Sequence, residues 1–128
     1  MRINISIDIE DAIRSVLSSY MTTYCRPLPK NFSLPCIEVH RVGGADDATI
    51  DSFEVVLDSR ANSEADADEI LRKAIGILKA VAGLQTSELR HVSVNSSGSW
   101  GMDPVRPELA MCSARLTVVA HQKKVEVS

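Results

Sequence analysis

The sequence has no continuous apolar run near the roughly 20 residues that a transmembrane helix needs. Its first eight residues lack an unbroken apolar segment and already include Asp8, so we expect no signal peptide. The three cysteines, Cys25, Cys36 and Cys112, are odd in number and irregularly spaced. This spacing argues against a disulfide framework and predicts free thiols in a reducing, cytosolic setting.

A basic excess is also missing, since the formal net charge is −3. That balance argues against nucleic-acid binding by bulk electrostatics, which uses a basic patch or stripe. The content of 45% hydrophobic and 24% charged residues is ordinary for a globular domain. A chain of 128 residues buries roughly two thirds of its unfolded surface, so it needs no metal or disulfide to fold. We therefore predict a single domain over residues 1–128.

Two segments have helical periodicity. Apolar residues spaced three and four apart predict a helix over 9–20 with Asp8 as N-cap. A second helix is predicted to begin after the N-cap Ser63 and to end before Gly83, a natural C′ residue. Its expected buried stripe is Ala67, Ile70, Leu71, Ala74, Ile75, Leu78 and Val81.

The remaining segments read as strands and loops. Three prolines predict an extended connector over residues 25–35. Alternating apolar residues predict four strands, at 36–42, 50–58, 89–95 and 108–121. Polar and Gly-rich residues predict loops at 43–49 and 96–107 and a flexible C-terminal tail at 122–128. The predicted fold is α+β with the order α-β-β-α-β-β, a four-stranded, mainly antiparallel sheet with both helices packed on one face.

No motif in this pattern points to catalysis. His40, His91 and His121 fall on three separate predicted strands without further ligands at metal spacing. Cys36 and Cys112 lie within strand patterns, where cysteine packs as a small hydrophobic residue. We therefore predict no enzyme, and no catalytic, cofactor-binding or metal residues.

The acidic group Asp46, Asp47 and Asp51 is typical of a solvated hairpin loop and lacks EF-hand spacing. The glycines at 43–44 and 98–101 match neither a Walker loop nor a dinucleotide fingerprint.

Several of these segments, taken in order, are similar to a known family. The run Leu34–Gly44, LPCIEVHRVGG, resembles the "LP-x-V-x-V-x-R-x-GG" segment of tail-terminator-like proteins of siphophages. In that family a strand ending in a polar residue and a helix opening with Ala and acidic residues follow, here Val55–Asp58 and Arg60–Ala67. A Ser-Gly-x-x-x-x-Asp-Pro loop then leads into the last strand, here Ser97–Pro104. The resemblance covers roughly Asp8 to His121.

The resemblance implies a structural protein of a bacteriophage virion that assembles as a homo-hexameric ring. Such a ring caps the finished tail tube, ends its polymerisation and forms part of the head–tail interface. The implied partners are further copies of the chain, the tail tube protein and the head connector or stopper protein. DNA passes through the ring without sequence-specific binding, and no cofactor, catalysis or membrane is implied. The implied location is the tail end of the head–tail junction in the virion, and the host cytoplasm during assembly.

We predict that the loops 43–49 and 96–107 make the protein contacts, because long loops on a compact scaffold are often functional. Tryptophan, arginine and methionine are common interface anchors. Trp100 is either such an anchor or a lid over the local core. The candidate interface residues are Arg41, Gly43, Gly44, Asp46, Asp47, Trp100, Met102 and Arg106.

Three alternatives compete with the tail-terminator hypothesis. A head-completion or connector protein has similar size and ring symmetry. A small enzyme or ligand-binding α+β domain would need a pocket with convergent polar groups. A regulatory protein would pair edge strands into a dimer.

Overall fold

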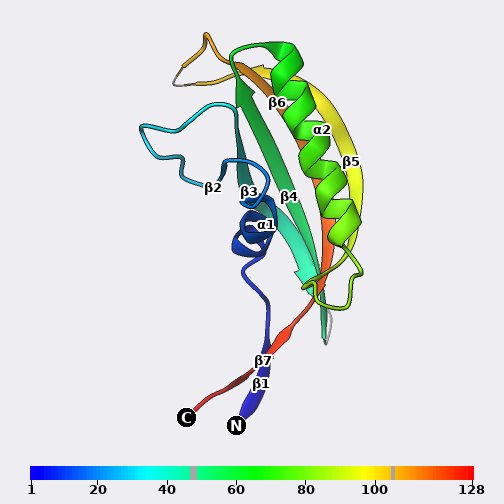
Figure 1. Cartoon of the computed structure of the whole chain (residues 1–128). Helices are drawn as coiled ribbons and strands as arrows, with labels where there is room; N and C mark the ends of the chain where they lie inside the picture. Colours follow the sequence, from blue (N-terminus) through cyan, green and yellow to red (C-terminus); the bar gives the residue numbers. More distant parts are fainter. Residues whose placement is uncertain (47–48, 105) are drawn as a thin grey trace.

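A computed structural model describes residues 1–46, 49–104 and 106–128 of the chain. Within these residues the chain forms two helices, α1 (Ile9–Leu17) and α2 (Glu64–Val81), and seven strands (Figure 1). The strands are β1 (Arg2–Ile5), β2 (Thr23–Cys25), β3 (Cys36–Asp46), β4 (Ile50–Ala61), β5 (Leu89–Met102), β6 (Ala110–His121) and β7 (Lys123–Glu126).

The strands form two separate sheets. The main sheet has five strands in the order β2-β3-β4-β6-β5, with β2 parallel to β3 and all other neighbours antiparallel. The second sheet is a two-stranded antiparallel ribbon of β1 and β7. Figure 1 shows this ribbon projecting from one end of the domain, with both chain termini at its tip.

The predicted strand number and order were wrong. The chain is α+β with two helices, as expected, but its order is β-α-β-β-β-α-β-β-β rather than α-β-β-α-β-β, and the main sheet has five strands rather than four. With three residues, β2 is too short to show a periodic pattern. Strands β1 and β7 pair across the whole length of the chain, and β7 lies inside the segment expected to be a flexible tail.

Both helices begin at the predicted caps. The side chain of Asp8 accepts a hydrogen bond from the backbone N–H of Asp11, and Ser63 does the same for Asp66. Helix α1 ends at Leu17, three residues earlier than predicted. Helix α2 ends as predicted, because Gly83 follows it at a φ of +83°, a conformation that glycine adopts without strain.

The hydrophobic core lies between the two helices and one face of the main sheet. Helix α1 packs on β2 and β3, while α2 packs mainly on β4, β6 and β5. Alternate residues of the long central strands point into this core and are buried. Its largest fully buried side chains are Phe53, Ile9, Ile13, Leu17, Ile37, Leu57, Leu71, Leu78, Leu89 and Leu116.

Shortening Leu71 should cost substantial stability, because its side chain is fully buried under α2. Leu71→Ala is expected to lower the free energy of unfolding by about 2–5 kcal/mol, as for other core truncations. Chemical denaturation measures the change. Leu84→Ala is the matched control, since Leu84 is 53% exposed, and its effect should stay within about 0.5 kcal/mol. A similarly small effect for Leu71→Ala would contradict the burial of the α2 stripe.

Candidate interaction surfaces

The first group of predicted interface residues lies on β3 rather than in a loop. Gly43, Gly44 and Asp46 continue the pairing with β4 beyond a bulge that follows Arg41. Strand β2 pairs only with Ile37–Val39, so no strand in the described part of the chain covers the other side of β3 beyond that point. These residues therefore lie on one edge of the main sheet. Asp47 is outside the described residues.

Two residues of this group have clear structural roles. Gly44 has a φ of +146°, and a Cβ there would lie 2.5 Å from the backbone oxygen of Ser52. Only glycine fits this approach of β3 to β4. Arg41 lies over the ring of Phe53, 4.8 Å from its centroid, and its backbone N–H donates to Glu10 of α1. Gly44 and Arg41 therefore hold β3 in place through contacts within the chain.

The second group lies on the opposite edge of the sheet. The segment predicted as a loop at 96–107 is strand as far as Met102, because β5 continues along β6 through several register shifts. Trp100 is 49% exposed and Met102 is 71% exposed. Trp100 pairs with Cys112, whose side chain is in the core, so Trp100 lies on the helix side of the sheet.

The two groups do not form one surface. Asp46 pairs with Asp51 at one end of β4, whereas Met102 pairs with Ala110, which pairs with Ala61 at the other end. The candidate residues therefore sit on opposite edges and towards opposite ends of the sheet.

Arg106 contributes to an internal contact. Its guanidinium pairs with Glu108 at 3.2 Å and lies over the ring of Phe32, 5.6 Å from the centroid. Arg106 thus links the chain between β5 and β6 to the Pro-rich connector.

The structure also contains a buried ionic network that the sequence reasoning missed. Arg60 at the end of β4 donates to Glu38 of β3 at 3.1 Å and to Asp103, which follows β5. All three residues are at most 5% exposed. Burial disfavours the charge of Arg60, but the hydrogen bond to Asp103 and the charge of Glu38 raise the pKa of Arg60 above its ordinary value. Arg26 lies 3.5 Å from the second oxygen of Glu38.

A second polar group lies beside this network. His40 lies 3.4 Å from Asp58, and the hydroxyl of Ser113 donates to the other oxygen of the same carboxylate. The carboxylate stands between the hydroxyl and the imidazole, so this order differs from a catalytic triad, in which histidine contacts serine directly. The hydroxyl of Ser113 and the imidazole of His40 thus each contact one oxygen of the Asp58 carboxylate.

Strand alternation places Glu38 and His40 on the sheet face opposite Ile37 and Val39. Glu38 is nevertheless buried, with the guanidinium groups of Arg26 and Arg60 against its carboxylate. The sequence contained one indication of the ionic network. Asp58 and Arg60 are two charged residues on one face of a strand whose opposite face is apolar.

The cysteine thiols are held in their neutral form. Burial raises the pKa of Cys36 to about 11, and burial also raises the pKa values of Cys25 and Cys112. Because the thiolate is the reactive species, these thiols are poor nucleophiles near neutral pH.

The raised pKa of Cys36 predicts a loss of stability at alkaline pH. Between about pH 9, the ordinary value, and about 11, the unfolded chain releases the Cys36 proton while the folded chain keeps it. The contribution of this thiol is therefore fully present below pH 9 and decreases as the pH rises towards 11. Denaturant titrations at several pH values should show a smaller decline for Cys36→Ala than for the unchanged chain. Equal slopes would contradict the assignment.

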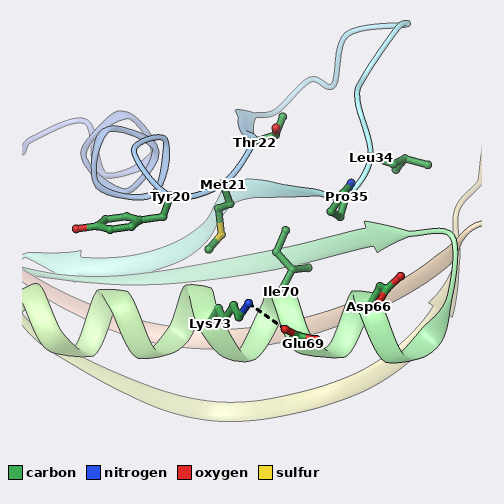
Figure 2. Close-up of a pocket in the computed structure, with 9 residues that line it drawn as sticks. All are labelled: Tyr20, Met21, Thr22, Leu34, Pro35, Asp66, Glu69, Ile70 and Lys73. Atoms are coloured by element: carbon green, nitrogen blue, oxygen red, sulfur yellow. Dashed lines mark ion pairs between the residues drawn. The ribbon is translucent and has the colours of Figure 1, made fainter.

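Two of the grooves in the described part of the chain lie in the helix layer. The α1–α2 groove, with a volume of about 390 Å³, runs between the end of α1, the end of the connector and the first half of α2 (Figure 2). It is lined by Tyr20, Met21, Leu34, Asp66, Glu69, Ile70 and Lys73, among others. The lower groove, of about 290 Å³, lies near the end of α2 and is lined by Val16, Val81, Leu84 and Glu88, among others.

Within residues 1–46, 49–104 and 106–128, no three His, Cys, Asp or Glu side chains cluster closely enough to hold a metal ion. No helix in the same residues has the length and apolar character to span a membrane. No protein-family model matches the chain, and no curated protein matches it either.

Proposed function

We propose that this protein is a structural component of phage tail assembly that closes into a ring, caps the tail tube and ends its polymerisation. The proposal rests on the resemblance of the chain to tail-terminator-like proteins and on one structural observation. The main sheet has two strand edges, on opposite sides, that no other described strand covers.

The first edge is β5, which pairs with β6 alone among the described strands and offers 14 residues of backbone. The second is the part of β3 beyond Arg41, because β2 ends opposite Val39 and the backbone N–H of Arg41 already donates to Glu10 of α1. Unpaired strand edges are templates for pairing with another chain. Two different edges facing opposite ways suit a head-to-tail contact between copies, and such contacts make rings when the rotation closes.

The remaining surface fits a structural role. The sheet face opposite the helices has mixed charges, including Glu54 and Arg115 at 3.7 Å. A face of mixed charge, on a chain with a formal net charge of −3, suits a channel through which DNA slides without sticking.

The test is assembly in the presence of tail tubes. Native mass spectrometry should find a ring of six at high protein concentration, and negative-stain images should show rings on the ends of tubes. A protein that stays monomeric or dimeric and never binds tube ends would exclude the proposal. Rings that bind head connectors but not tubes would point to a head-completion protein instead.

A further inference from the structure

The β1–β7 ribbon has an apolar face that remains partly exposed in the described part of the chain. Ile3 pairs with Val125, and strand alternation places Ile5 on the same face. Val127 bonds to the backbone of Met1, which extends this face to the tip. Ile3 is 37% exposed and Val127 is 45% exposed. Because an isolated two-stranded ribbon is marginally stable in water, this face needs a surface to cover it.

The α1–α2 groove has the complementary character. Its apolar floor includes Met21, Leu34 and Ile70. Figure 2 shows Ile70 pointing up from α2, with Met21 on one side and Leu34 on the other. Its rim has two carboxylates, Asp66 and Glu69, against the single ammonium group of Lys73, which pairs with Glu69 at 2.9 Å. The groove is thus apolar inside and acidic at the rim.

The ribbon has the opposite charge. Its cations are Arg2, Lys123 and Lys124, and its one acidic side chain is Glu126. By the same alternation Lys123, opposite Ile5, lies on the apolar face, whereas Arg2 and Lys124 lie on the other face. An apolar face with Lys123 beside it matches an apolar floor with Asp66 and Glu69 at its rim. The lower groove has only Glu88 as an acidic residue and is smaller, so it matches less well.

The ribbon cannot reach the α1–α2 groove of its own chain. It leaves the domain at the end where α2 terminates and points away from the body, whereas the groove lies beside the first half of α2 (Figure 1). Helix α2 has 18 residues and is about 27 Å long, while the four residues of β1 span only about 13 Å. A β1–β7 ribbon seated in this groove must therefore belong to another molecule.

We propose that the β1–β7 ribbon of one copy docks into the α1–α2 groove of the next copy, apolar face down, and clamps neighbouring subunits together. The inference rests on the proposed ring and names one of its subunit contacts. The contact is heterologous, because ribbon and groove are different surfaces of the same chain, so it can repeat around a closed ring.

Cross-linking between two single variants tests the contact. Both are made with Cys25→Ser, which leaves Cys36 and Cys112, both buried. One variant has Ile3→Cys in the ribbon, and the other, tagged to differ in mass, has Glu69→Cys at the groove rim. Mixing them under mild oxidation should give a mixed disulfide-linked dimer as the main product. The matched controls pair Ile3→Cys with Glu54→Cys on the open sheet face and with Glu88→Cys in the lower groove, and should stay monomeric on denaturing gels.

A second variant, Ile3→Asp, places a charge on the apolar face without touching the core. It should keep the melting temperature and lose ring formation. Rings could form without a cross-link between the Ile3→Cys and Glu69→Cys variants, or with a preferred cross-link to Glu88→Cys. Either result would overturn the ribbon contact but not the proposed ring. Absence of both rings and cross-links would overturn the ribbon contact and the proposed function together.

Discussion

Arg60→Ala is expected to lower the free energy of unfolding by about 3–5 kcal/mol, which is a large part of the stability of a small domain. The substitution leaves the carboxylates of Glu38 and Asp103 buried without the guanidinium that lies between them. Arg26 offers only partial relief, since it is more than half exposed and 3.5 Å from Glu38. Urea or guanidinium denaturation measures the loss.

The exposed pair of Arg72 and Asp68 provides the control. Arg72 also pairs with a carboxylate, at 2.8 Å, but its side chain is 67% exposed. Arg72→Ala should therefore cost only about 0.3–0.5 kcal/mol. Replacing the whole network with uncharged residues, as Arg60→Met with Glu38→Leu and Asp103→Asn, should recover most of the loss because no buried charge then remains and the asparagine side chain at position 103 can still accept from the backbone N–H of Arg106. Similar small effects for Arg60→Ala and Arg72→Ala would show that the network is hydrated.

The position of this network connects stability to the interaction surface. Asp103 directly follows Met102, the last residue of β5, and its second oxygen accepts from the backbone N–H of Arg106. Arg60 thus links the end of the edge strand β5 to β4, the central strand of the sheet. Substitution of Arg60 should loosen the segment that holds Trp100 and Met102.

The sequence predicted a helix, cap or hairpin well where the residues that determine it lie within one short stretch of the chain. The caps Asp8 and Ser63 are confirmed, and so are the hairpin of β3 and β4 and the buried residues of α2 from Ala67 to Leu78. Ile70 and Val81 are only partly buried, because the α1–α2 groove and the end of the helix leave them open.

The missed strands depend on partners that are distant in the chain. Residues 96–102 are rich in serine and glycine, which favour turns, yet they pair with β6 because that strand is long enough to offer them backbone groups. The alternation of Ile3, Ile5 and Ile7 was visible, but its partner β7 is about 120 residues away. The buried ionic network was hidden for the same reason, since its members come from four separate segments.

Trp100→Ala should leave most of the melting temperature intact and abolish ring formation and tube capping. The indole is 49% exposed and lies near the end of the free β5 edge, beside Met102 at 71%. Burial against a neighbouring copy would remove this apolar surface from water, and tryptophan is the residue type most often found as an interface anchor. Thermal unfolding and native mass spectrometry on the same sample measure the two effects separately.

The control for Trp100→Ala is Leu84→Ala, which shortens an apolar side chain of similar exposure, 53%, near the opposite end of β5 from Trp100 and should leave assembly unchanged. The two roles of Trp100 predict different outcomes. If the indole instead covers the local core near Cys112, the variant loses several degrees of melting temperature, because its ring would then stabilise the sheet. If stability and assembly are both normal, Trp100 is not an anchor. The β5 contact would then depend on the backbone of the edge strand, where pairing between copies needs no particular side chain.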